Sequence, residues 1–244
     1  MQSGLYVSLS SQIALERRLT TIADNMANAN TVGFRATDVK FDQVLSNTQN
    51  DIGAKVAFVS QGNDYLSERQ GELSQTGNNL DFAVRGDAWF AINTPVGKVL
   101  TRDGRFTLSE TGELMSSRGY PVLDAGGAPI QVQRDGGPLR VGRDGNIYQN
   151  EKLVGSIGLF GADLAQGFVR YENSGVIPTQ TAQPIVNSNS VGVMQGFLEQ
   201  SNVNGIGEMT QLIQVNRAFE SISSLMKDSE ASLDEAIKTL GGSR

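Results

Sequence analysis

The side chains best suited to chemistry in this sequence are five aspartates of its middle part. Two carboxylates that face each other across a cleft catalyse glycoside hydrolysis, and the candidates are Asp81, Asp87, Asp103, Asp135 and Asp144. Three of the five precede a glycine, where aspartate is favoured by turn geometry. We therefore interpret them as turn residues and predict no catalytic residue. A carbohydrate-active β enzyme with helical extensions stays open as a second hypothesis.

Other catalytic and cofactor sites lack the residues they need. The 244-residue chain has no Cys and no His, which excludes thiolate nucleophiles, disulfides and Cys/His zinc sites. The glycines of 155–161 recur every third residue instead of in the order of a dinucleotide-binding loop. Residues 144–146 are too few for a calcium loop. We predict no cofactor, no metal and no small-molecule substrate.

Charge and hydropathy restrict the partners. Lys and Arg number 20 against 26 Asp and Glu, a net charge of -6, which disfavours nucleic acid as a partner because phosphate binding needs basic side chains. No apolar run approaches the roughly 20 residues that span a bilayer. The first residues show no basic stretch followed by an apolar core, so we expect export, if any, without a cleaved Sec-type signal.

Glycine and proline divide the chain into three parts, because both residues are disfavoured inside helices. Residues 53–204 hold 22 of the 28 glycines and all 6 prolines, and the 33 residues between Gly207 and Gly241 hold neither. This layout predicts helical ends around a turn-rich middle.

Both ends carry apolar residues at alternating spacings of four and three, the pattern of a helix with one packed face. The N-terminal seam consists of Met1, Leu5, Ser8, Gln12, Leu15, Leu19, Ile22 and Met26. The C-terminal seam consists of Met209, Leu212, Asn216, Phe219, Ser223, Met226, Glu230, Leu233, Ile237 and Leu240.

Local signals place the helix ends. Gly33 is expected at the left-handed C-terminal position of the first helix, with Phe34 folded back on its last turn. Asn202 or Asn204 is expected to cap the last helix, and Gly241 to end it. A helix over 206–240 would be roughly 50 Å long.

The middle alternates apolar and polar residues with period two, as in Leu80, Phe82 and Val84, and has a turn signal about every ten residues. This pattern predicts an antiparallel all-β domain of barrel or sandwich type. The fold class is therefore α+β, with discontinuous terminal helices that pair as a coiled-coil-like shaft and an inserted β domain. The predicted segments are an N-terminal helix (1–35), an extended linker with short strands (36–75), the β domain (76–195) and a C-terminal helix (196–244).

Two seams separated by the β domain have two explanations. They form a hairpin packed on their own domain, or they meet each other and then neighbouring copies to build a filament or tube through heterologous contacts. We favour the second explanation, because a domain inserted into a helical hairpin leaves the helices as a shaft. The residues expected to carry assembly are Leu5, Leu15, Leu19, Ile22, Met26, Met209, Leu212, Phe219, Met226, Leu233, Ile237 and Leu240.

Four segments resemble the bacterial flagellar rod and hook protein family, in the family's order. They are 27–35, 70–86, 101–106 and 195–220. The motif residues they share with the family are Asn28, Asn30, Thr31, Gly33, Phe34, Gly71, Thr76, Gly77, Asn78, Leu80, Gly196, Leu198, Glu199, Ser201, Asn202 and Val203. Arg35, Phe219 and Trp89 differ from the residues usual in the family. The opening residues and the length resemble those of its proximal rod members.

The resemblance implies a structural subunit that is not an enzyme. Such subunits leave through the flagellar type III exporter and polymerise in the periplasm, with self and other rod proteins, into the drive shaft that transmits torque from motor to hook, near the basal-body base and ring components. Phe41 and Leu45 fit the pattern by which subunits dock on the export gate, although Phe41 also fits packing between helix and domain. A phage tail or baseplate component, another axial assembly, stays open as a third hypothesis.

Overall fold

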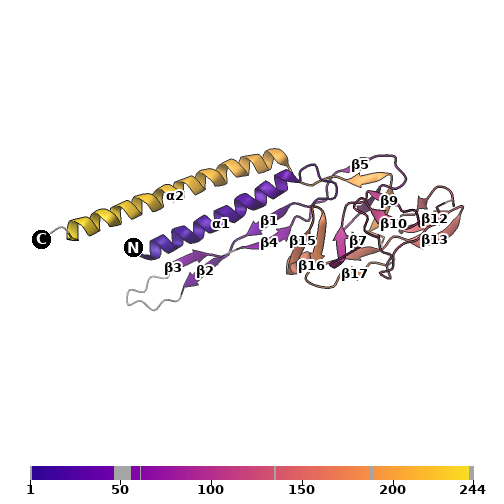
Figure 1. Cartoon of the computed structure of the whole chain (residues 1–244), viewed down its shortest axis with the longest axis horizontal. Helices are drawn as coiled ribbons and strands as arrows, with labels where there is room; N and C mark the ends of the chain where they lie inside the picture. Colours follow the sequence, from indigo (N-terminus) through magenta and orange to yellow (C-terminus); the bar gives the residue numbers. More distant parts are fainter. Residues whose placement is uncertain (1, 47–55, 61, 135, 187–188, 242–244) are drawn as a thin grey trace. The chain divides into compact units, whose positions relative to one another are not determined.

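The computed structural model describes residues 2–46, 56–60, 62–134, 136–186 and 189–241, in two compact units (Figure 1). The helical unit comprises residues 1–27, 37–64 and 204–244, and the β unit comprises residues 28–36 and 65–203. A helix at each end and a β-rich middle confirm the predicted α+β class. The four predicted segments, taken as domains, stay a prediction.

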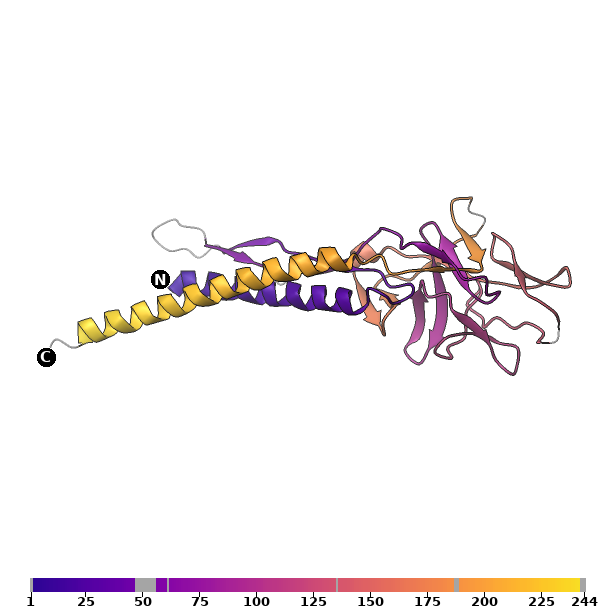
Figure 2. The same cartoon turned by 90° about the horizontal axis from the view of Figure 1, so that it is seen from above.

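The helical unit is built on two long antiparallel helices that lie side by side in Figures 1 and 2. Strand β2 pairs antiparallel with β3, and β1 pairs with β4. The elements of this unit, with β4 ending two residues beyond it, are α1 (Gln2–Ala27), β1 (Thr37–Lys40), β2 (Gln43–Ser46), β3 (Val56–Val59), β4 (Asn63–Leu66) and α2 (Gly205–Gly241).

The end of α1 and the start of α2 follow from local chemistry. The Asn204 side chain accepts a hydrogen bond from the Gly207 N–H at 3.2 Å, so Asn204, one of the two predicted residues, caps α2. Glu208 stands in the first turn of α2, where the helix dipole favours a negative charge. Helix α1 ends at Ala27, six residues before Gly33. The expectation that Gly33 ends α1 is therefore wrong.

The β unit consists of short strands, and the described strands pair antiparallel with one another. Its largest sheet has the order β15-β16-β8-β7-β14-β17. Its elements are β5 (Leu73–Gln75), β6 (Phe82–Arg85), β7 (Trp89–Thr94), β8 (Gly97–Thr101), β9 (Phe106–Leu108), β10 (Leu114–Ser116), β11 (Arg140–Val141), β12 (Asn146–Gln149), β13 (Lys152–Ser156), β14 (Leu159–Gly161), η1 (Leu164–Gln166), β15 (Phe168–Tyr171), β16 (Gly175–Pro178), β17 (Gln183–Pro184), β18 (Gly192–Gln195) and β19 (Phe197–Glu199).

Two hydrophobic cores cover opposite faces of strand β7. Phe90 packs in one cluster with Phe106, and Trp89 packs in the other with Phe160. Successive side chains of a strand point to opposite faces, so the period-two pattern places neighbours in different cores. Strand β7 is consequently buried along most of its length, with Asn93 exposed.

Candidate functional site

Residues from all four family-like segments meet in the β unit around the buried side chain of Glu199. Glu199 ends strand β19 and lies opposite Leu73 of β5. The residue is 1% exposed. A carboxylate is almost never buried so completely unless it is paired with a positive charge.

Two arginines and one main-chain N–H surround this carboxylate. Arg102 donates from Nη1 to Oε2 at 2.9 Å, and Arg35 donates from Nε to Oε1 at 3.3 Å. The Gly71 N–H donates to Oε1 at 3.2 Å. The cluster therefore joins residues that are up to 164 positions apart in the sequence.

The Trp89 ring is the third component of this cluster. The guanidinium carbon of Arg102 lies 5.0 Å from the ring centroid, and that of Arg35 lies 5.5 Å from it, within the range of a cation–π interaction. Two buried guanidinium groups thus share one carboxylate and one aromatic ring. The large Trp89 ring thus lies beside both cations.

Arg102 is the most deeply buried member. Burial lowers the pKa of Arg102 from its ordinary value to about 10, and Glu199 opposes that shift. Its Nη2 donates to the Gly86 carbonyl at 2.9 Å and lies 3.9 Å from the exposed Asp87 carboxylate. Its Nε has no hydrogen-bond partner among the described residues. The side chain depends on Glu199 for its buried counter-charge.

Two glycines let the main chain approach the cluster. The Gly33 N–H donates to the Glu199 carbonyl at 2.7 Å, and a Cβ at Gly33 would lie 2.2 Å from the Asp103 nitrogen. A Cβ at Gly71 would lie 1.8 Å from the Gln200 carbonyl oxygen. Both distances are too short for a carbon atom, so both positions require glycine. Gly33, with φ +69°, serves this close contact.

Asn202 links two segments of the chain that lie far from it in the sequence. Its Oδ1 accepts from the Ala36 N–H at 2.7 Å, and its Nδ2 donates to the Arg69 carbonyl at 2.7 Å. The side chain is therefore fully engaged within the β unit. This use explains why Asn204, and not Asn202, caps α2.

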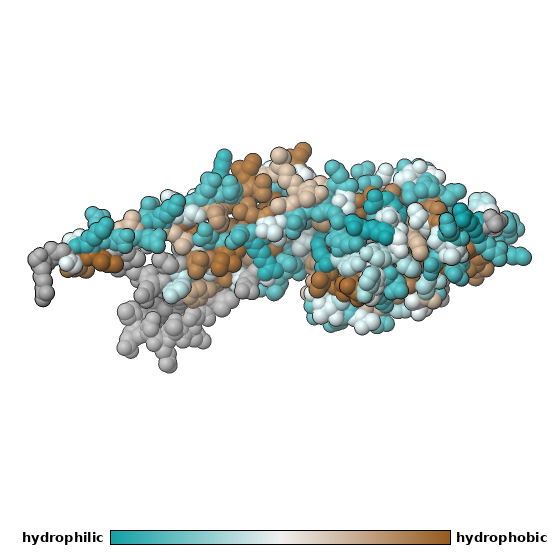
Figure 3. Space-filling view, in the orientation of Figure 1, coloured by the Kyte–Doolittle hydropathy of each residue, from teal (hydrophilic) through white to brown (hydrophobic). Residues whose placement is uncertain are grey.

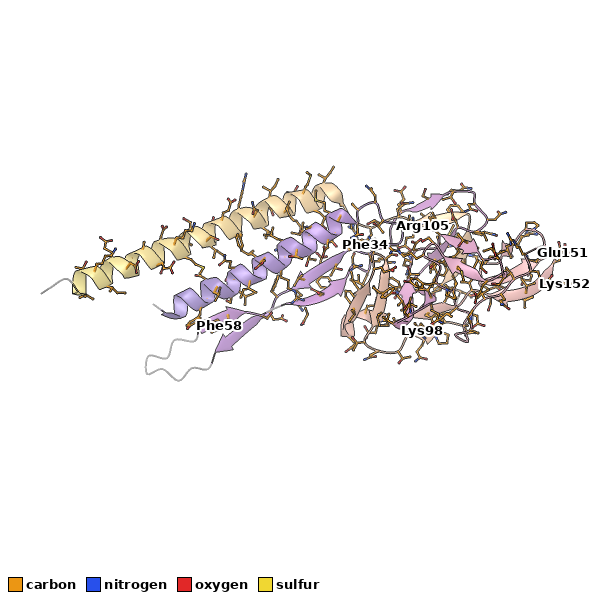
Figure 4. All side chains as sticks on the ribbon, viewed as in Figure 1. Phe34, Phe58, Lys98, Arg105, Glu151 and Lys152 are labelled. Atoms are coloured by element: carbon orange, nitrogen blue, oxygen red, sulfur yellow. The ribbon has the colours of Figure 1, made fainter. Side chains whose placement is uncertain are left out.

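Phe34, which is labelled in Figure 4, is buried within the β unit under a guanidinium group. The Arg170 Cζ lies 4.4 Å from the centroid of its ring, and Arg170 also donates to the Arg35 carbonyl. The Phe34 ring thus contributes to the segment that presents Arg35 to Glu199.

The remaining motif residues hold turns. Asn78 Oδ1 accepts from the Leu80 N–H at 3.2 Å, and the Thr76 N–H donates to the Gly196 carbonyl at 2.8 Å. Among the other motif residues, Thr31 Oγ1 donates to Asn28 Oδ1 at 3.0 Å, and Ser201 Oγ accepts from the Val203 N–H at 3.3 Å. Leu198 is buried, whereas Asn30 and Gly77 are exposed.

The N-terminal seam lies on the packed side of α1. Ile22 is 3% exposed, and Leu15, Leu19 and Met26 are half-buried. Gln12 Nε2 donates to Ser223 Oγ at 3.5 Å, so this side of α1 faces α2. The described side chains do not include those of Met1 and Leu5.

On α2 the buried positions differ in part from the seam in the sequence. Leu212, Phe219 and Met226 are half-buried, and Val215 is buried where the seam has the exposed Asn216. Three other seam residues are exposed, namely Met209, Ile237 and Leu240, and the side chain of Leu233 lies outside the described ones.

Asn25 is a buried polar residue that the apolar spacing of α1 does not indicate. Its Oδ1 accepts from the Thr37 N–H at 2.9 Å, and its Nδ2 donates to the Thr37 carbonyl at 2.8 Å and to Glu208 Oε1 at 3.4 Å. Burial, and next the Asp38 carboxylate, raise the pKa of Glu208. Asn25 thereby links α1 to β1 and α2, a role that no apolar pattern signals.

The residues proposed for the export gate lie in the helical unit. Phe41 is half-buried, and its ring would lie 2.8 Å from a Cβ added at Gly62. Leu45 belongs to β2 and pairs with Ala57, and its side chain is not among the described ones. The structure thus gives Phe41 at least one packing contact.

The aspartates considered for catalysis are engaged elsewhere. Asp103 and Asp144 each accept a main-chain N–H two residues on, at 3.1 Å, as expected of turn residues. Asp81 accepts from Asn78, Asp87 is exposed, and Asp135 lies outside the described residues.

A cleft of about 270 Å³ in the β unit has a polar lining, but its charged side chains are paired with each other. Arg105 lies 2.6 Å from Asp103, and Arg118 lies 3.1 Å from Glu172. In the described part of the chain, no three acidic side chains gather as metal ligands. Likewise, none of the described helices has the length and apolar character needed to cross a membrane.

Three family models match the chain. The model described as "Flagella basal body rod protein" matches residues 5–35, "Flagellar hook protein FlgE/F/G D1 domain" matches 83–149, and "Flagellar basal body rod FlgEFG protein C-terminal" matches 194–239. These ranges include Gly33, Arg35, Arg102 and Glu199. Three of the four family-like segments thus have side chains in the buried cluster and fall at least in part within a matched range.

Full-length relatives agree with these matches. The chain is 60% identical to the flagellar basal-body rod protein FlgF of Rhizobium meliloti over the whole of both chains, and 60% identical to that of Mesorhizobium japonicum over 99% of each. It is 30% identical to the flagellar basal-body rod protein FlgG of Bacillus subtilis, over 97% of this chain and 98% of the relative.

Proposed function

The chain belongs to the flagellar basal-body rod protein family, and we propose that it polymerises through α1 and α2 into the proximal part of the rod. It is a structural subunit of the flagellar basal body and not an enzyme, as the sequence predicted.

Exposed apolar side chains on the helices are the observation that carries the proposal. On α2, Ile206 is 81% exposed and Met209 and Ile213 are each 53% exposed. Their spacing of three and four places them on one face of the helix. Figure 3 shows hydrophobic atoms gathered over the first turns of α2. When a neighbouring subunit covers such an apolar stripe, the contact is stabilised by roughly 25 cal/mol for each Å² of apolar surface removed from water.

The helices provide the shaft in this proposal. We infer a coiled-coil-like pairing from the regular spacing of seven residues between the half-buried Leu212, Phe219 and Met226. Torque from the motor then passes to the hook through packed helices. The β unit, which we take as barrel-like or sandwich-like from its two cores, stands as an inserted domain.

The route to the rod is the second part of the proposal. The subunit passes the flagellar type III export gate and joins self and other rod proteins in the periplasmic space, near the base and ring components. Phe41 and Leu45 are the proposed gate-docking residues. A chain without cysteine forms no wrong disulfide in an oxidising compartment, which fits this route.

The test compares two neighbouring exposed positions of α2, Ile213 and Gln214. Ile213→Asp places a charge on the apolar stripe, whereas Gln214→Asp changes a polar exposed residue. We expect both purified variants to keep the wild-type circular dichroism and melting temperature. Cells with Ile213→Asp should lack complete rods and swimming, and cells with Gln214→Asp should swim. Normal swimming of both strains would contradict assembly through this face.

A further inference from the structure

Helix α2 is longer than the helix that covers it. It has 37 residues, and α1 has 26. Two contacts fix their antiparallel register, Gln12 with Ser223 at 3.5 Å and Asn25 with Glu208 at 3.4 Å. Counted from these contacts, α1 covers α2 as far as about residue 232. We call residues 233–241 the overhang.

The overhang continues the face of α2 that packs on α1. Phe219, on that face, is half-buried. Ile237 follows it by five complete turns of 3.6 residues, so both side chains leave the helix in the same direction. Ile237 is nevertheless 66% exposed, and Leu240 is 84% exposed. The helix interface thus extends beyond the end of α1, where no described residue of the same chain covers these two side chains.

Helix α1 carries a matching apolar face. Tyr6 is 60% exposed, Leu9 41% and Ile13 51%. Ile13 precedes the buried Ile22 by two and a half turns, so these three side chains lie opposite the side that packs on α2. Strand β3 flanks this face at Ser10, whose Oγ accepts from the Val59 N–H at 3.5 Å, and Leu9 is the member of the face that points farthest from Ser10. The face of Tyr6, Leu9 and Ile13 is the outer face of α1.

The spacing of the two faces fits an antiparallel pair. The outer face of α1 reads 6, 9, 13, with steps of three and four, and the overhang reads 233, 237, 240, with steps of four and three. When one helix is reversed, the two series coincide, as in the antiparallel pairing inside the chain. A helix with the apolar spacing of α1 can therefore cover the apolar side chains of the overhang, and a second copy of this chain supplies such a helix.

We propose that the overhang of one subunit packs antiparallel on the outer face of α1 of the next subunit, with Ile237 against Leu9 and Leu240 against Tyr6. This pairing rests on the proposed assembly through the helices, and it specifies which residues of α2 and of the neighbour's α1 lie opposite each other. Relative to the pairing inside one chain, α1 of the neighbour is displaced along the axis by about 12 residues, or ~18 Å.

Cysteine cross-linking tests this register, and because the chain has no cysteine of its own, only the introduced cysteines of the chain can form its disulfides. Cells that carry Leu9→Cys with Ile237→Cys are grown, and their basal bodies are isolated and oxidised. We expect a ladder of disulfide-linked dimers and larger multimers on non-reducing gels. Tyr6→Cys with Leu240→Cys, in the same register, should give the same ladder. Co-expression of the wild-type chain maintains rod formation if a double variant alone assembles poorly.

Two matched pairs serve as controls. Ile13→Cys with Leu240→Cys is seven residues out of register, about 10 Å along the axis, and should give no ladder. Gln12→Cys with Ser223→Cys should cross-link within one chain, because these side chains meet at 3.5 Å, and should form no multimer. Each single variant should stay monomeric.

The outcomes separate this inference from the proposed function. Swimming cells with complete rods but no ladder from either in-register pair would overturn the pairing and leave assembly through the helices intact. Basal bodies of swimming cells that do not contain the chain would overturn the proposed function. As a further check, Ile237→Asp should abolish swimming, and Thr239→Asp, on the opposite side of the overhang, should preserve it.

Discussion

Arg102 donates from Nη1 to Oε2 of Glu199 at 2.9 Å, and both side chains are almost completely removed from water. Arg35 shares the same carboxylate. A buried ion pair adds little stability over an apolar pair, but removing one partner leaves an uncompensated charge in the interior. The stability of the β unit should therefore be sensitive to this single carboxylate.

Glu199→Gln removes the negative charge and keeps the shape of the side chain. Two buried guanidinium groups then lack a counter-charge, and we expect a loss of about 3–5 kcal/mol in unfolding free energy. Urea unfolding of the purified chain measures it. Asp87→Asn is the control, because the exposed Asp87 lies 3.9 Å from Arg102, and an exposed pair contributes at most about 1 kcal/mol. Equal effects of the two substitutions would contradict the importance of burial.

Gly33→Ala and Gly77→Ala separate backbone strain from steric clash. Both glycines have a positive φ, +69° at Gly33 and +73° at Gly77. A Cβ at Gly33 would lie 2.2 Å from the Asp103 nitrogen, whereas a Cβ at Gly77 meets nothing within 4 Å. Gly77→Ala should cost about 1 kcal/mol, and Gly33→Ala should cost several times more. Thermal unfolding of both variants checks this order, which equal melting temperatures would refute.

The limits of the β unit can be tested with fragments. The sequence places the β domain at 76–195, a range that omits Arg35 and Glu199. In such a fragment Arg102 has no buried carboxylate, so we expect weak or non-cooperative unfolding. A fragment of residues 28–203 contains the whole cluster and should unfold in one cooperative transition. Equal stability of the two fragments would show that the cluster is dispensable.

Local features of the fold were predictable from the sequence, because they depend on neighbours in the chain. The cap at Asn204 and the turns at Asp103 and Asp144 each involve residues two or three positions apart. The same is true of the helical ends around a glycine-rich middle.

The buried cluster was not predictable from physical patterns. Arginine and glutamate are mostly exposed, and nothing in the spacing of residues 35, 102 and 199 indicates that they meet. The resemblance to a family identified Glu199 without its role. The sequence predicts a helix cap at Gly33, because a close approach to a distant segment leaves no local signal beyond the glycine itself.

Phe41→Ala tests the export proposal against a packing role. Val39 and Phe41 both lie within 3 Å of a Cβ added at Gly62, so Val39→Ala removes a comparable contact outside the proposed docking pattern. We expect Phe41→Ala to reduce secretion while Val39→Ala does not, with similar unfolding midpoints. Immunoblots of the secreted fraction measure the difference. Equal secretion of the two variants would remove the gate-docking role of Phe41.

The last prediction concerns the register of the helix interface. The apolar spacing in the sequence points to position 216, whereas the structure buries Val215 at 5% exposure and leaves Asn216 exposed. Val215→Asp puts a carboxylate between the helices, which costs several kcal/mol unless the group is protonated or the helices separate.

We expect Val215→Asp to reduce the helical circular dichroism signal of the purified chain and to prevent rod formation, because the face that holds α2 on α1 is lost. Asn216→Asp changes an exposed polar side chain and should leave both properties near wild type. Val215→Thr, which keeps the shape without a charge, should fall between them. If Asn216→Asp were the more damaging substitution, position 216 of the sequence seam, and not Val215, would lie in the helix interface. Phe219 would then no longer define the face of α2 that packs on α1, and the proposed pairing of Ile237 with Leu9 would lose its support.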